Sequence, residues 1–142
     1  MTDTWTRTVL DLLLGGGLVT LGAMVGTPAR FFLSGVVARR FGETIPWGTL
    51  VVNASGCLVM GMVGAYASKH GLSSNSAYWL LAATGFLGSY TTVSSFALQT
   101  RALARDGEVR FAAGYVMLSL AACLAAVALG LWIEPHIAGG MP

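Results

Sequence analysis

The chain has 142 residues, of which 55% are hydrophobic and only 10% are charged, and its formal net charge is +2. Soluble domains usually carry about 25% charged residues, so this composition excludes an ordinary soluble domain. The charges also leave long uncharged stretches, each of which reaches or approaches the roughly 20 residues that cross a bilayer. We therefore predict an integral membrane protein with a single transmembrane domain over residues 1–142.

Taken in chain order, the apolar stretches predict four transmembrane helices at about 9–37, 46–68, 76–103 and 111–133. The alternative for the first stretch is a cleaved signal peptide. Its start is mixed in charge and its apolar run is too long for that alternative. Gly71 is the expected stop of the second helix. The predicted fold class is an all-α membrane protein.

The positive charges are distributed unevenly over the predicted loops. Arg7 and Lys69 would lie on one side of the membrane. The arginines on the other side would be Arg30, Arg39, Arg40, Arg101, Arg105 and Arg110. Because positive loops stay on the cytoplasmic side, we expect both termini outside, in a multi-pass protein of the cell's inner (plasma) membrane.

The third predicted helix contains an unusually polar segment at residues 85–96. Two glycines and five serine or threonine residues fall near the middle of this span. Glycine weakens a helix, and serine and threonine hydroxyls compete for backbone hydrogen bonds. We therefore expect the helix to break here, freeing carbonyls for a cation and N–H groups for an anion. The alternative is a hydroxyl-lined packing seam within a continuous helix.

Two further helices carry polar residues at membrane depth. Asn53 in the second helix needs a partner, and its amide N–H groups can donate to an anion. Tyr115, Ser119 and Cys123 recur every four residues in the fourth helix, which puts them on one face. That stripe is either an ion track or a set of interhelical hydrogen bonds.

Several residue patterns are absent from the sequence. No acidic residue lies at the centre of a span, which disfavours a proton-coupled carrier. We find no nucleophile–base pair, metal cluster or nucleotide loop, so we expect neither an enzyme nor a nucleic-acid partner. Cys57 and Cys123 lack the close spacing of a redox or metal motif, so we expect no such chemistry from them.

One motif stands out in each of the first three predicted helices. In chain order they are Gly22-x-x-x-Gly26-Thr27-x-x-Arg30-Phe31, Pro46-Trp47-Gly48-Thr49-Leu50-x-Val52-Asn53-x-x-Gly56 and Thr84-Gly85-Phe86-Leu87-Gly88-x-x-Thr91-Thr92-x-Ser94-x-Phe96. With Tyr115 and Ser119 in the fourth helix, they resemble the CrcB/Fluc family of fluoride channels. Each motif is modest alone, but the four together are specific.

The resemblance implies an antiparallel, dual-topology-type dimer with two narrow fluoride pores, which exports fluoride passively and protects the cell. It implies that membrane lipid surrounds the dimer and that a structural or activating Na⁺ ion lies at its centre. Backbone carbonyls of Gly88 and Thr91 would hold that ion. The positions assigned to the fluoride pathway are Arg30, Asn53, Thr92, Val93, Phe96, Tyr115 and Ser119.

The chain departs from the family pattern at three positions. Val93 stands where the family usually has Phe, Cys123 where it often has Ser or Thr, and Gln99 where Glu is common. Because valine has no ring edge to offer an anion, we consider both a homodimer and a heterodimer with a paralogous subunit. The alternatives of another class are a proton-coupled small multidrug transporter and a non-transporting membrane assembly subunit.

Overall fold

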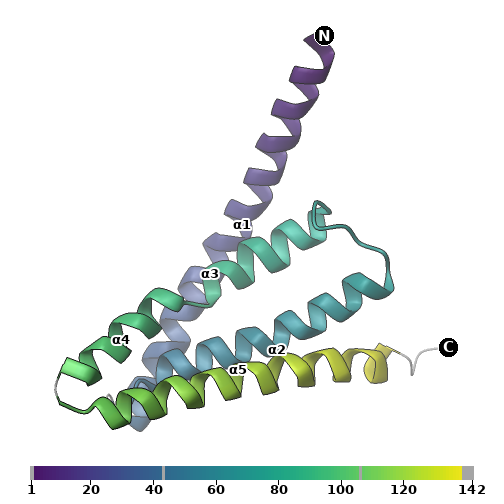
Figure 1. Ribbon diagram of the computed structural model, residues 1–142. Helices are drawn as coiled ribbons and strands as arrows, with labels where there is room; N and C mark the ends of the chain where they lie inside the picture. The colour runs from purple at the N-terminus through teal and green to yellow at the C-terminus, as the bar shows by residue number, and fades with distance from the viewer. Residues whose placement is uncertain (1, 43, 106, 139–142) are drawn as a thin grey trace.

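The computed structural model describes residues 2–42, 44–105 and 107–138, and these residues form helices and no strand (Figure 1). The helical segments, in chain order, are α1 (Thr2–Phe41), α2 (Trp47–Lys69), η1 (Trp79–Leu87), α3 (Gly88–Tyr90), α4 (Val93–Arg105) and α5 (Val109–Ala138). The predicted all-α class is therefore confirmed for the described residues.

Three helical stretches are long and apolar enough to cross a membrane: Thr4–Phe41, Trp47–Lys69 and Val109–Glu134. They cover the first and fourth predicted spans, and all of the second except Pro46. The helix α1 is longer than its predicted range of 9–37, because charged side chains end an apolar run without interrupting backbone hydrogen bonds. The third predicted span, 76–103, is divided among η1, α3 and α4.

Glycines in a left-handed conformation follow three of the helices, and the last of them is Gly107, just beyond α4, with φ 82°. Gly42 comes directly after α1 with φ 81°, and Gly71 lies just beyond α2 with φ 61°. Residues with a Cβ rarely adopt these angles, so glycine is the usual residue where a helix stops. The prediction that Gly71 stops the second helix is confirmed.

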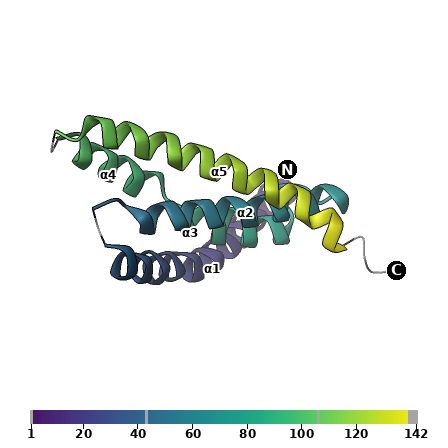
Figure 2. The same cartoon turned by 90° about the horizontal axis from the view of Figure 1, so that it is seen from below.

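The helices α2 and α5 lie side by side in both views and make the most extensive contact in the described part of the chain (Figures 1 and 2). Glycines bring their backbones together. A Cβ on Gly61 would meet the Val127 carbonyl and lie 3.0 Å from the Gly130 Cα. A Cβ on Gly130 would lie 3.0 Å from the Met62 backbone nitrogen. Such small residues permit close helix contacts in membranes, where apolar burial drives association little.

A second close contact joins α1 to η1. A Cβ on Gly22 would lie 2.6 Å from the Phe86 backbone nitrogen, and one on Gly85 would lie 2.6 Å from the Val19 carbonyl oxygen. Farther along, α3 contacts α1, whereas α4 contacts α5. The chain therefore passes from the α1 side to the α5 side between α3 and α4, and this crossing contains the predicted site.

Candidate functional site

The helical path that begins with η1 is interrupted near its middle. The segment η1 is wound as a π-helix, a form that is rare and frequently found at functional sites. After it, α3 ends at Tyr90, Thr91 is extended with φ −78° and ψ 162°, and α4 begins at Val93. The extended Thr91 turns its carbonyl out of the direction that a helix would impose.

Threonine hydroxyls form hydrogen bonds with the backbone on both sides of the interruption. The Thr91 hydroxyl donates to the Leu87 carbonyl at 2.9 Å. The Thr92 hydroxyl accepts a hydrogen bond from the Ser95 backbone N–H at 3.2 Å. The second bond has the geometry of a helix N-cap, so Thr92 is the residue that starts α4.

The side chain of Asn53, in α2, forms hydrogen bonds with the backbone of the interrupted segment. Its side-chain Nδ2 donates to the Thr92 carbonyl at 2.8 Å, and its Oδ1 accepts from the Thr92 N–H at 2.8 Å. One amide therefore satisfies both backbone groups of Thr92. Since the Asn side chain has two N–H donors, one remains for another acceptor. The partner that the sequence required for Asn53 is the backbone of Thr92.

The structure brings five of the seven predicted pathway residues together at one groove of about 320 Å³. The residues that line it are Asn53, Cys57, Thr91, Thr92, Val93, Phe96, Ser119, Leu120 and Cys123. All of these side chains are uncharged. The groove therefore presents amide and hydroxyl groups beside an aromatic ring, without a fixed ion of either sign.

Ser119 is a buried polar residue in the wall of this groove. It is 7% exposed, and its hydroxyl oxygen has no hydrogen-bond partner among the described residues. Leaving a buried hydroxyl without a partner costs about 1–3 kcal/mol. A ligand that accepts the Ser119 O–H would recover this free energy.

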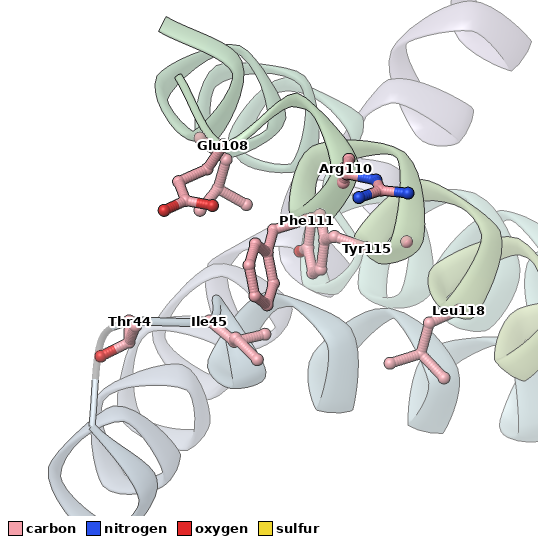
Figure 3. Close-up of a pocket in the computed structure, with 9 residues that line it drawn as sticks. Thr44, Ile45, Glu108, Arg110, Phe111, Tyr115 and Leu118 are labelled. Atoms are coloured by element: carbon pink, nitrogen blue, oxygen red, sulfur yellow. The ribbon is translucent and has the colours of Figure 1, made fainter. Parts of the chain in front are cut away.

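Tyr115, the sixth predicted pathway residue, lies outside that groove. Its ring packs against Phe96 with centroids 5.5 Å apart, and its hydroxyl donates to the Pro46 carbonyl at 3.4 Å. It lines a separate and mainly apolar cavity of about 400 Å³, together with Phe111 and Leu118 (Figure 3). The sequence prediction missed this cavity, although Phe111, Tyr115 and Leu118 share one helix face by spacing.

Arg30, the seventh predicted residue, also lies outside the groove that contains Asn53. It is half-buried and lines a hollow of about 300 Å³ with Thr27, Ser34 and Ser95 among other residues. Thr92 lines both this hollow and the Asn53 groove. The two compartments therefore meet at Thr92, with the arginine on one side and the uncharged donors on the other.

The predicted cation positions, Gly88 and Thr91, line a fourth and smaller hollow of about 190 Å³ with Gly56 and Cys57 among other residues. The described residues contain no group of three or more His, Cys, Asp or Glu side chains that could hold a metal.

Comparison with known proteins gives consistent matches over most of the chain. The sequence profile described as CrcB-like protein, Camphor Resistance (CrcB), matches residues 17–131. A protein of Rhodopseudomonas palustris (strain BisB18) named fluoride-specific ion channel FluC 2 is 60% identical over 121 residues, or 84% of this chain and 92% of the relative. A Bradyrhizobium diazoefficiens protein of the same name is 48% identical, over 85% of this chain and 89% of the relative. A Brucella abortus protein named fluoride-specific ion channel FluC 4 is 47% identical, over 82% and 91%.

Proposed function

The chain belongs to the CrcB-like family, and from this we propose that it is a fluoride-selective ion channel subunit. It exports fluoride passively and protects the cell from fluoride toxicity. One observation carries the proposal. The Asn53 amide, the buried Ser119 hydroxyl and the Phe96 ring meet at a single groove, beside an interruption of the helical backbone.

The groove has the chemistry that a fluoride pathway requires. Fluoride is small and strongly hydrated, so a pore must replace its water with good hydrogen-bond donors. The free N–H of Asn53 and the O–H of Ser119 are such donors, and a phenylalanine ring has a positive edge. No lining residue is charged, so binding stays weak enough for the ion to leave, as conduction requires.

We propose that η1, α3 and α4 together form the third of four transmembrane spans, broken at Thr91–Thr92. Irregular backbone at membrane depth is tolerated where it is buried in protein or lines a wet cavity. The bonds from Asn53 to Thr92 supply part of that protection. The Arg30 hollow supplies positive potential at one approach to the groove.

We propose further that the functional unit is an antiparallel dimer. Val93 lines the groove and is 78% exposed, so the polar residues beside it need a cover other than lipid. A second subunit is that cover. The numbered names of relatives from Rhodopseudomonas and Brucella favour several copies within one bacterium, and the partner is either a second copy of this chain or a paralogue.

At the centre of the dimer we place a structural or activating Na⁺ ion, held by backbone carbonyls of Gly88 and Thr91. The extended conformation of Thr91 supports this placement. We assign the dimer to the cell's inner (plasma) membrane as a multi-pass protein that is not an enzyme. Three long apolar helices support a multi-pass arrangement.

A fluoride efflux assay tests the proposal. The purified chain, alone or co-purified with a paralogue from the same genome, is placed in liposomes and read with a fluoride electrode. Asn53→Asp puts a negative charge in the groove and removes a donor, and we expect the rate to fall about 100-fold, equivalent to about 2.7 kcal/mol. Leu124→Ala, on a 67% exposed position of α5, is the control and keeps the native rate.

Two results would contradict the proposal. One is fluoride efflux at the level of empty liposomes for the chain both alone and with its paralogue. The other is full efflux by the Asn53→Asp variant, which would remove the groove from the pathway.

A further inference from the structure

We propose that the thiols of Cys57 and Cys123 form a paired site for a soft metal ion with linear two-coordinate geometry, such as Hg²⁺, Ag⁺ or Cu⁺, in the wall of the candidate pathway. Cys57 belongs to α2 and Cys123 to α5, far apart in the sequence. The sequence alone gave no reason to pair them, and we expected no metal chemistry from either.

The helix contact brings the two cysteines together. Glycine contacts join Gly61 of α2 to Val127 of α5, and the Tyr115 hydroxyl bonds the Pro46 carbonyl at the other end. The two helices therefore run in the same direction. Cys57 precedes Gly61 by one turn, and Cys123 precedes Val127 by one turn. One turn before this backbone contact, the two cysteines lie at corresponding positions on either side of the seam, and both line the same groove.

The pair also lies where an ion would be exposed to it. Both cysteines are half-buried and free of disulfides, and both line the groove that contains Asn53 and Ser119. Another turn back along each helix leads from Cys57 to Asn53 and from Cys123 to Ser119. A metal ion bridging the thiols would therefore sit one turn from the proposed fluoride donors.

The donor set selects the class of metal. Thiolate sulfur is a soft ligand that favours soft ions over Mg²⁺ or Ca²⁺. The described residues offer no cluster of three or more His, Cys, Asp or Glu ligands, so a tetrahedral zinc site is not available. Two opposed thiolates suit linear coordination. With HgCl₂, two S–Hg bonds form, two Hg–Cl and two S–H bonds break, and two protons and two chlorides leave, with no change of oxidation state.

Mercuric chloride is the probe, because the uncharged molecule needs no cation pathway to reach the groove. With one equivalent, intact-mass spectrometry should show one mercury per chain without chloride, and both thiols should stop reacting with maleimide. Fluoride efflux should stop, and excess dithiol should restore it. Either Cys57→Ser or Cys123→Ser should leave a chloride on the bound mercury and raise the half-inhibitory concentration about 100-fold, since one of two linked ligands is lost.

The matched control carries Cys123→Ser and Leu124→Cys together, which keeps two thiols but moves one to a neighbouring position of α5 that is 67% exposed. It should behave as a single-thiol variant. Bridging in this control, or two separate mercury adducts on the native chain, would overturn the paired site. The efflux readout rests on the proposed function, whereas the mass and maleimide readouts do not. Bridging without any basal efflux would therefore defeat the channel and leave the metal site standing.

Discussion

The two sides of α2 are built in different ways. Toward α5, glycines let the backbones touch, so the contact is steric and no solvent or ion can replace it. Toward the junction of α3 and α4, the contact consists of hydrogen bonds between the Asn53 amide and the Thr92 backbone. Hydrogen bonds can be exchanged for bonds to a ligand. The helix α2 thus makes a rigid backbone contact on its α5 side and presents a polar site that a ligand could enter on the side of the α3–α4 junction.

The largest loss of stability should come from disrupting the close glycine contact between α2 and α5. In Gly61→Ala the new methyl would meet the Val127 carbonyl and the Gly130 Cα. Overpacking typically costs about 1–3 kcal/mol, and we expect more than that here because backbone atoms would have to move. We expect a lower unfolding temperature in detergent and less folded protein. Gly64→Ala on the same helix has open space and is the control. Equal losses in the two variants would refute the steric account.

The next effect should come from the polar side. Asn53→Ala leaves the N–H and carbonyl of Thr92 without their side-chain partners, at a cost of about 2–3 kcal/mol for the pair. Thermal unfolding should show a clear loss of stability. Ser55→Ala removes the hydroxyl bond with Tyr90 at 2.8 Å and a local bond to the Val52 carbonyl at 3.1 Å, and it should cost less because no backbone group at the interruption loses its partner. A smaller loss for Asn53→Ala than for Ser55→Ala would show that the interruption does not depend on Asn53.

A substitution at the groove itself should change transport more than stability. Val93 is 78% exposed in the single subunit, so Val93→Phe adds a ring without a clash inside that subunit. If the ring edge stabilises the passing anion by about 1 kcal/mol, the initial fluoride efflux rate should rise severalfold. Val93→Leu adds apolar bulk without a ring and is the control. An increase in both variants would assign the effect to bulk rather than to the aromatic edge.

The smallest effect should come from Tyr115→Phe. The bond from Tyr115 to the Pro46 carbonyl is 3.4 Å long, beyond the usual range for O–H donors, and the ring contact with Phe96 is kept. We expect a loss of less than about 0.5 kcal/mol in thermal unfolding and a nearly native efflux rate. A strong fall in efflux would mean that this hydroxyl contacts the ion directly.

Much of the fold could be predicted because the bilayer imposes a simple rule on composition. Three uncharged stretches became the three long apolar helices, α1, α2 and α5. The boundaries of α1 could not be read in the same way, because hydropathy reports where a lipid environment ends and not where helical hydrogen bonding ends. The π-helical winding of η1 also has no sequence signal that we recognised.

The sequence predicted which residues belong to the candidate site better than it predicted which of them lie together. Motif resemblance selected Asn53, Val93, Phe96 and Ser119, which do share a groove. It placed Tyr115 and Arg30 in the same pathway, although each lines a separate cavity. The pairing of Cys57 with Cys123 was missed because it depends on how two helices are aligned along their axes, which only the three-dimensional packing reveals.

The length of α1 has a practical consequence. A Cβ at Gly15 of α1 would touch Leu80, near the start of η1. A Cβ at Gly48, near the start of α2, would meet Ser34 of α1. The other helices therefore contact α1 between about residues 15 and 34. The residues before Gly15 extend past the other helices (Figure 1), over about 20 Å at 1.5 Å per residue. An affinity tag or a fluorophore attached to this projecting end would therefore leave every helix contact of the bundle untouched.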